Sequence, residues 1–190
     1  MSHALIIAEV RRGQFEERNL DSVGFCSLLG KQAVLVAPAG EYAIGEKSVD
    51  TVVRVAAEES LFLNPLNMTT IIGKEIETRG KPDVIVFTSS SSGSELAAYT
   101  AGHFNLPIIT DVSGLDKERS IFYKSYYSDK IFGEFRPVAG GPFVVTVRSG
   151  SFKEHAVEKP AAAGVETMEG LAFAGGRAFM EYVEEEKGEI

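Results

Sequence analysis

A run of hydroxyl side chains that ends in a glycine is the segment of this sequence best suited to bind a ligand. Its residues are Thr88, Ser89, Ser90, Ser91, Ser92 and Gly93. The run follows an apolar stretch and precedes a helical pattern, so its backbone amides would lie at a helix N-terminus, where phosphate groups bind. The alternative is that Ser92 caps the helix with Glu95 at capping-box spacing, while the other serines face solvent.

Charged side chains at the end of the first apolar run form a second candidate. Glu9, Arg11 and Arg12 lie there, and a guanidinium group at this point could bind a phosphate or the carboxylate of a partner protein. The alternative is a solvated charged turn. A third candidate is Asp111, which could accept a hydrogen bond from a ligand hydroxyl or, alternatively, cap a turn with Ser113.

Several kinds of chemistry lack the residues that they require. The sequence has neither G-x-G-x-x-G nor G-x-x-x-x-G-K-[ST], which argues against ordinary dinucleotide dehydrogenases and ATPases. The three histidines, His3, His103 and His155, are not placed for a catalytic triad or with metal-ligand spacing. The single cysteine, Cys26, lies among apolar residues and is expected to be buried. We therefore predict no catalytic residue and no metal site.

Charge and hydropathy exclude further partners. The net charge of −8 and the pI near 5.0 argue against nucleic acid or an anionic membrane as a ligand, because both require clustered lysine and arginine. The apolar run near the N-terminus is too short for a signal peptide, and no stretch has the length of a membrane span. These features predict a cytoplasmic protein without membrane insertion.

The candidate residues lie between apolar strands and amphipathic helices that alternate along the chain. Strands are expected at 4–10, 32–37, 51–56, 84–87 and 106–110, and helices at 22–29, 65–80 and 94–104. This alternation predicts an α/β fold with a doubly wound parallel sheet, Rossmann-like in class. Ligands of such sheets bind at the carboxyl ends of the strands where the winding direction switches. The loops after the strands at 4–10 and 84–87 should therefore face each other.

The pattern changes after residue 120. Runs at 121–127, 130–136 and 143–148 are rich in aromatic and β-branched residues and predict an antiparallel extension along one edge of the sheet. Residues 153–170 have the composition of a linker, and a short helix is expected at 178–186. The aromatic residues of the extension could form a partner surface or pack an edge hairpin. They are Phe122, Tyr123, Tyr126, Tyr127, Phe132 and Phe135.

Four segments in order resemble the amino-terminal domain of the electron transfer flavoprotein alpha subunit. They are Ala4 to Glu9 with Arg12-Gly13 after it, Phe87 to Ala98, Leu106 to Val112, and Arg136 to Phe152. The last segment is the most specific. Its Arg136–Gly141 stretch looks like the glycine turn of that family, and its Thr146–Phe152 stretch looks like the closing strand.

The resemblance implies an adenine nucleotide alpha hydrolase-like domain over residues 1–152. It also implies that residues 153–190 are a linker and the stub of an FAD domain, because Gly175-Gly176-Arg177 is similar to the turn that opens that domain. In the family, FAD is carried by the carboxy-terminal domain of the alpha subunit, most of which we expect to be absent here, and AMP lies in the beta subunit.

The same resemblance implies a non-catalytic component of electron transfer between flavin dehydrogenases and a downstream acceptor. Its partner would be a beta-type subunit, or a second copy of the chain in a homodimer. FAD is the implied cofactor, and AMP is possible. The alternative is a stand-alone domain that binds or senses an adenine nucleotide, with Glu9, Arg11, Thr88, Ser89, Ser90, Ser92, Gly93 and Asp111 as its site residues.

Overall fold

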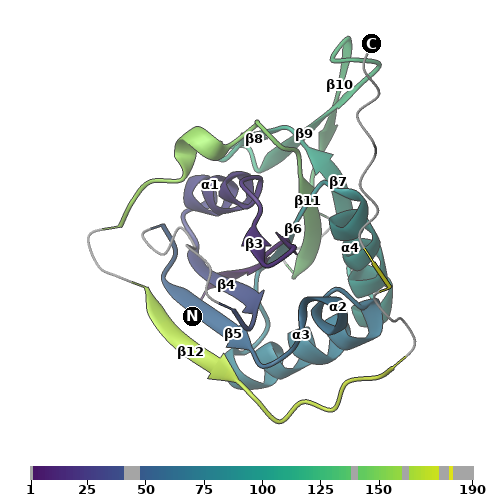
Figure 1. Ribbon diagram of the computed structural model, residues 1–190. Coiled ribbons are helices and arrows are strands. Elements are labelled where there is room, and N and C mark those ends of the chain that lie inside the picture. Colours follow the sequence, from purple (N-terminus) through teal and green to yellow (C-terminus); the bar gives the residue numbers. More distant parts are fainter. Residues whose placement is uncertain (1, 41–47, 138–140, 160–162, 176–179, 182–190) are drawn as a thin grey trace, which may run out of the picture.

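A parallel sheet of seven strands forms the centre of the molecule. The computed structural model describes residues 2–40, 48–137, 141–159, 163–175 and 180–181. The strands are β1 (His3–Ile7), β4 (Gln32–Pro38), β5 (Thr51–Val55), β6 (Val84–Thr88), β7 (Ile108–Val112), β11 (Phe143–Val147) and β12 (Gly164–Met168). Their order in the sheet is β12-β5-β4-β1-β6-β11-β7 (Figure 1). The predicted α/β class with a doubly wound parallel sheet is confirmed.

Helices cover both faces of this sheet. They are α1 (Asn19–Leu29), α2 (Glu59–Phe62), α3 (Pro65–Arg79) and α4 (Ser91–Phe104). Successive residues of a strand point to opposite faces, so Ala4 and Ile6 of β1 pack on the side of α1, whereas Leu5 and Ile7 pack on the side of α3 and α4. Figure 1 shows α3 and α4 together on one side and α1 on the other. Such double coverage explains the continuous apolar runs of the central strands.

The start of the helix agrees with the sequence for α3 and differs for α1. Asn64 caps α3 as predicted, since its Oδ1 accepts a hydrogen bond from the amide of Leu66 at 3.0 Å. Helix α1 begins at Asn19, three residues before the expected start of the helix at 22–29. The carboxylate of Asp21 accepts hydrogen bonds from the amides of residues 150, 152 and 153. It therefore anchors the segment after β11 on α1.

The first strand is shorter than predicted because the chain turns back on itself after it. Strand β1 ends at Ile7, and β2 (Val10–Arg11) and β3 (Gln14–Phe15) then form a small antiparallel hairpin. Its two central residues, Arg12 and Gly13, both have positive φ, of 53° and 70°. A two-residue turn with positive φ at both positions matches the right-handed twist of the paired strands.

The strands after residue 120 are only in part antiparallel. Strands β8 (Gly114–Asp116), β9 (Ile121–Tyr126) and β10 (Ile131–Phe135) form a separate antiparallel sheet, which confirms the antiparallel prediction for two of the three runs. The prediction was wrong for the third, because β11 runs parallel to its neighbours and lies between β6 and β7. Its apolar residues are buried in the sheet, where a parallel strand is covered on both faces.

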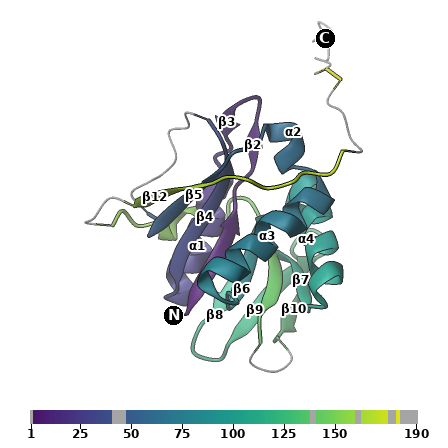
Figure 2. The same ribbon diagram turned by 90° about the horizontal axis from the view of Figure 1, so that it is seen from below.

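The segment expected to be a linker also contributes to the fold. It contains a helical turn at Lys153–His155 and then β12, which pairs with β5 at the edge of the parallel sheet. Beyond β12 the chain crosses the N-terminal end of α3 (Figure 2). There the side chain of Asn67 accepts a hydrogen bond from the amide of Ala174 at 2.8 Å and donates one to the carbonyl of Ala174 at 3.2 Å. The helix expected at 178–186 lies outside the described residues, apart from Met180 and Glu181, which are not helical.

Candidate functional site

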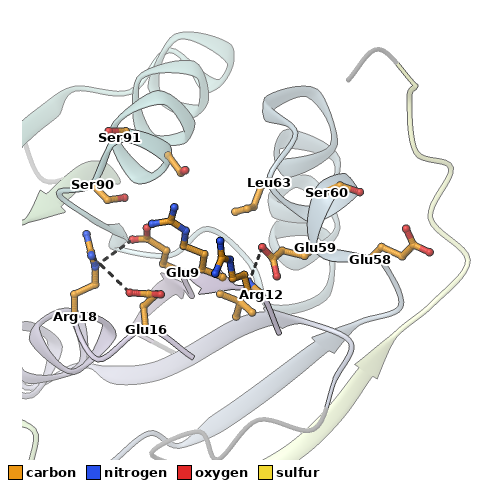
Figure 3. Close-up of a pocket in the computed structure, with 13 residues that line it drawn as sticks. Glu9, Arg12, Glu16, Arg18, Glu58, Glu59, Ser60, Leu63, Ser90 and Ser91 are labelled. Atoms are coloured by element: carbon orange, nitrogen blue, oxygen red, sulfur yellow. Dashed lines mark hydrogen bonds and ion pairs between the residues drawn. The ribbon is translucent and has the colours of Figure 1, made fainter. Parts of the chain in front are cut away.

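A large cleft among the described residues lies at the switch point of the sheet. The chain winds from β1 to β4 and β5 and then crosses to β6 on the other side of β1, so the loops after β1 and β6 face each other as expected. Between them is a cleft of about 910 Å³ (Figure 3). Its lining consists of Glu9, Glu16, Glu58, Glu59, Arg11, Arg12, Arg18, Ser60, Ser90, Ser91, Ser92, Val10 and Leu63.

Asn19 fixes the loop that brings Glu9 to the cleft. This asparagine is fully buried at the start of α1. Its Oδ1 accepts from the amide of Glu9 at 2.8 Å, and its Nδ2 donates to the carbonyls of Glu9 and Glu16 at 2.7 and 2.8 Å. Three of the four hydrogen bonds that a side-chain amide can make are thus directed at the loop. The backbone that presents Glu9 is held rigidly.

The carboxylate of Glu9 connects the two sides of the cleft. It accepts a hydrogen bond from the hydroxyl of Thr88 at the end of β6, and the Nε of Arg18 lies 3.9 Å from its Oε2. The same arginine approaches Glu16, with Nη2 at 3.6 Å from Oε2 (Figure 3). These contacts place acidic and basic groups in alternation along the floor of the cleft.

A second carboxylate holds the turn of the β2–β3 hairpin. Glu59 of α2 accepts hydrogen bonds from the amides of Arg12 and Gly13 at 3.2 and 3.0 Å. The segment after β5, with Glu58 and the start of α2 at Glu59, forms the wall of the cleft opposite the N-terminus of α4 (Figure 3). Arg11 also lines this cleft and is exposed to solvent.

The start of α4 is set by Ser90 and Gly93. The Oγ of Ser90 accepts from the amide of Gly93 at 2.9 Å, which makes Ser90 the N-cap and corrects the predicted Ser92–Glu95 capping box. A Cβ atom on Gly93 would lie 2.1 Å from the carbonyl oxygen of Thr88, so only glycine allows α4 to begin this close to β6. Gly93, predicted from the sequence as a site residue, thus has a packing role.

Six of the eight residues predicted from the sequence come together here. Glu9, Arg11, Ser90 and Ser92 line the cleft, and Thr88 and Gly93 lie beneath it. The other two, Ser89 and Asp111, are not among the described lining residues. The hydroxyl of Ser89 donates to Oδ1 of Asp111 at 3.0 Å, in a separate cluster at the ends of β6, β7 and β11.

Arg148 organises that separate cluster. Its Nε donates to Oδ1 of Asp111 at 3.1 Å, its Nη2 donates to Oδ2, and its Nη1 bonds Asp129 Oδ1 at 3.0 Å and the hydroxyl of Ser125. The hydrogen bonds from Arg148 hold the pKa of Asp111 below its usual range, and the same pairing raises the pKa of Arg148. Thus Arg148, held by Asp111, links strands of the core to the β9–β10 hairpin.

The sequence pattern does not identify all the residues of the site, because some of them are far in the sequence from the motifs that predict it. Arg18, Glu58 and Glu59 line the cleft, but no motif marks them. The signal available was positional, since Glu58 and Glu59 follow the expected strand 51–56 and the ends of parallel strands meet at one edge of a sheet. Asn19 carries no comparable signal, because its role depends on burial.

The chemistry of the lining fits part of a nucleotide. Hydroxyls at the N-terminus of α4 and three guanidinium groups suit a phosphate, and carboxylates such as Glu9 suit ribose hydroxyls. The described lining contains neither histidine nor cysteine, and its titratable side chains are four glutamates and three arginines. Only Val10 and Leu63 are apolar among the residues described there, and they provide no broad apolar surface for a flavin ring.

Comparison with protein families gives one match. The family model of the electron transfer flavoprotein domain matches residues 5–171. This range begins inside β1 and ends just beyond β12, so it includes the other six strands of the parallel sheet in full and most of β1. A search of curated proteins finds no match. Among the described residues, none of the helices combines the length and hydropathy needed to cross a membrane.

Proposed function

Because this chain belongs to the electron transfer flavoprotein domain family, we propose that it is an alpha-type component that works with a beta-type partner. The match over residues 5–171 carries the proposal. The proposed complex passes electrons from flavin dehydrogenases to a downstream acceptor, and this chain acts as its scaffold and partner-binding part.

In this proposal the FAD lies outside the cleft. A bound FAD would supply the redox chemistry, but the polar lining around Glu9, Arg18 and Glu59 does not fit its ring system. The part of this chain that the resemblance relates to an FAD domain, Gly175 to Arg177, is only partly within the described residues. We therefore derive no step of electron transfer from the cleft.

Co-purification with a beta-type subunit tests the proposal. The tagged chain is expressed together with the beta-type electron transfer flavoprotein subunit of the same genome, and each protein is also expressed without the other. We expect the two to co-purify and the complex to show flavin absorption that a flavin dehydrogenase can bleach. Failure to associate, with no flavin in any preparation, would refute an electron transfer role.

A second candidate function is the binding of an adenine nucleotide in the cleft. The observation that favours it is the arrangement of the Ser91 and Ser92 hydroxyls at the first turn of α4, facing a cleft that Arg11 also lines. The amides and dipole at a helix N-terminus favour a phosphate, and a guanidinium group adds charge-assisted hydrogen bonds. In this alternative the chain senses the nucleotide and performs no chemistry on it.

Thermal melting with AMP tests this second candidate. A ligand that binds only the folded state stabilises it by about 2.7 kcal/mol at a hundred times its Kd, so AMP should raise the melting temperature. Adenosine, which lacks the phosphate, should raise it less. Arg11→Ala should reduce the AMP shift, whereas the control Arg119→Ala, on an exposed side chain in the turn between β8 and β9, should preserve it. Identical melting with and without AMP would exclude the site.

A further inference from the structure

The β9–β10 hairpin carries an unusual concentration of exposed apolar side chains. Tyr127 is 77% exposed, Phe132 57% and Ile131 54%, and all three belong to this hairpin. Figure 1 shows the hairpin extending beyond the body of the domain. Grouped exposed apolar residues of this kind commonly mark a protein interaction surface.

The backbone of β10 is open on one side. In the small sheet the order is β10-β9-β8, so β10 pairs with β9 and none of the other described strands lies along its outer edge. Exposed edges are usually blocked by lysine, proline or a bulge. Within β10 the residues are Ile131, Phe132, Gly133, Glu134 and Phe135, so the strand contains no lysine or proline and one charged residue, and Lys130 lies just before it. Its outer edge is suited to pairing with another strand.

The hairpin is also held in a fixed position. Arg148, at the end of β11, donates hydrogen bonds to Asp129 in the hairpin turn and to Ser125 in β9. The same guanidinium group is bound to Asp111 at the end of β7. The core of the domain therefore fixes the hairpin before any partner arrives, which lowers the entropy lost on association.

The sequence of the edge is complementary to itself. In an antiparallel pair related by a two-fold axis at Phe132, residues whose numbers are equally far from 132 lie opposite each other. Lys130 then faces Glu134 of the second copy, and Glu134 faces Lys130 of the second copy. Phe132 of one copy faces Phe132 of the other between these two ion pairs. Side chains alternate along a strand, so these three residues share one face of the joined sheet.

The opposite face of the same pairing is also filled. Ile131 lies across from Gly133 of the second copy, where the rings of Phe135 and Tyr126 cover the missing side chain. A Cβ atom on Gly133 would lie 2.8 Å from Phe135 Cε2 and 3.1 Å from Tyr126 Cε2. The isoleucine would therefore pack on two aromatic rings, a contact that stabilises cross-strand pairs.

We propose that β10 is a homodimer interface, in which two copies of this chain pair their β10 edges antiparallel about a two-fold axis at Phe132. The interface is isologous and closed, because the same edge is used by both copies and no free edge remains for a third. Lys130, in the turn that precedes β10, and Glu134 set the register by charge. Both side chains are exposed in one copy of the chain, where Glu134 Oε2 also lies 3.9 Å from Nη2 of Arg119. The proposal does not depend on a role in electron transfer.

Charge exchange at the two ion pairs tests the proposal. Sedimentation equilibrium should show a reversible dimer for the wild-type chain. Lys130→Glu and Glu134→Lys should each weaken it roughly tenfold or more, because each places like charges opposite each other at two symmetric points. An equimolar mixture of the two variants should dimerise again, since every facing pair is then of opposite charge. The double variant should also recover.

A matched control and a second variant keep the test independent of folding. Lys81→Glu makes the same charge change on an exposed residue between α3 and β6 and should leave the dimer unchanged. Phe132→Ala should weaken the dimer while circular dichroism shows a folded chain. A monomeric wild-type chain would overturn the proposal, as would a dimer that both charge variants leave intact. Hairpin variants that affect only binding of a beta-type subunit would also overturn it.

Discussion

Arg148 donates two hydrogen bonds to the carboxylate of Asp111, and this pair joins the ends of β11 and β7. The shorter of them runs from Nη2 to Oδ2, and the other joins Nε to Oδ1 at 3.1 Å. Both side chains are about 30% exposed. A bidentate pair of this kind fixes geometry more strictly than a single ion pair does. It also makes the stability of the domain depend on pH.

Asp111→Asn should lower the free energy of unfolding at neutral pH by about 1–2 kcal/mol, because charged but partly exposed hydrogen bonds are lost. The pKa of Asp111 is lower in the folded chain than its usual 3.8, so its contribution is complete above that value and disappears as the pH falls through the lowered pKa. The two proteins should thus converge in acid. Urea unfolding followed by circular dichroism measures this, since the chain has no tryptophan. A difference that stays constant into acid would contradict the assignment.

Gly93→Ala should destabilise the fold by about 1–3 kcal/mol, because a buried position without room for a methyl group forces neighbouring atoms to move. The clash is with the backbone carbonyl of Thr88, which cannot rotate away. Gly102→Ala in the same helix is the matched control. It has open space around it and should stabilise the helix by roughly 0.5–1 kcal/mol. Equal effects of the two changes would argue against the packing role.

Ser90→Ala should cost about 1 kcal/mol of stability, as expected for loss of an N-cap. Ser92→Ala, two residues further along, should change stability by less than about 0.5 kcal/mol, because its hydroxyl is not the cap. Thermal unfolding of both variants gives the comparison. A larger loss at Ser92 would restore the capping box that the sequence pattern favours.

Cys26 should resist thiol reagents in the native chain. It is fully buried, and burial raises the pKa of its thiol, so almost no thiolate is present at neutral pH. Reaction with a disulfide reagent should proceed only through unfolding and should accelerate with urea. Because the chain has one cysteine, the reaction reports a single site. Rapid labelling without denaturant would show that α1 opens locally.

The sequence predicts those parts of the fold whose signals are local. Strands buried on both faces appear as continuous apolar runs, of which 84–87 is the clearest, and the Asn64-Pro65 pair marks the start of α3 by its backbone geometry. The position of the cleft follows as well, because a sheet that winds in two directions has one switch point. These inferences require no knowledge of distant contacts.

The remaining features depend on contacts between residues far apart in the sequence. The apolar run of β11 is the same whether its neighbours run parallel or antiparallel, so its place between β6 and β7 is not encoded locally. Four of the five residues of β12 are exposed, which hides it from any hydrophobic pattern. Among four successive serines, the close approach of Gly93 to Thr88 selects the helix cap.

Strand β11 follows β7 in the sequence but lies between β6 and β7 in the sheet, and this limits the order in which the domain can assemble during synthesis. Strand β7 leaves the ribosome before β11. In the finished sheet β11 lies between β6 and β7, so these two strands are joined by hydrogen bonds only through β11. Non-local pairing of this kind slows folding and leaves strand edges exposed in the meantime. A nascent chain that has formed α4 and β7 therefore exposes the edges of β6 and β7 that β11 later covers. Chaperone binding at that stage would protect these edges from aggregation.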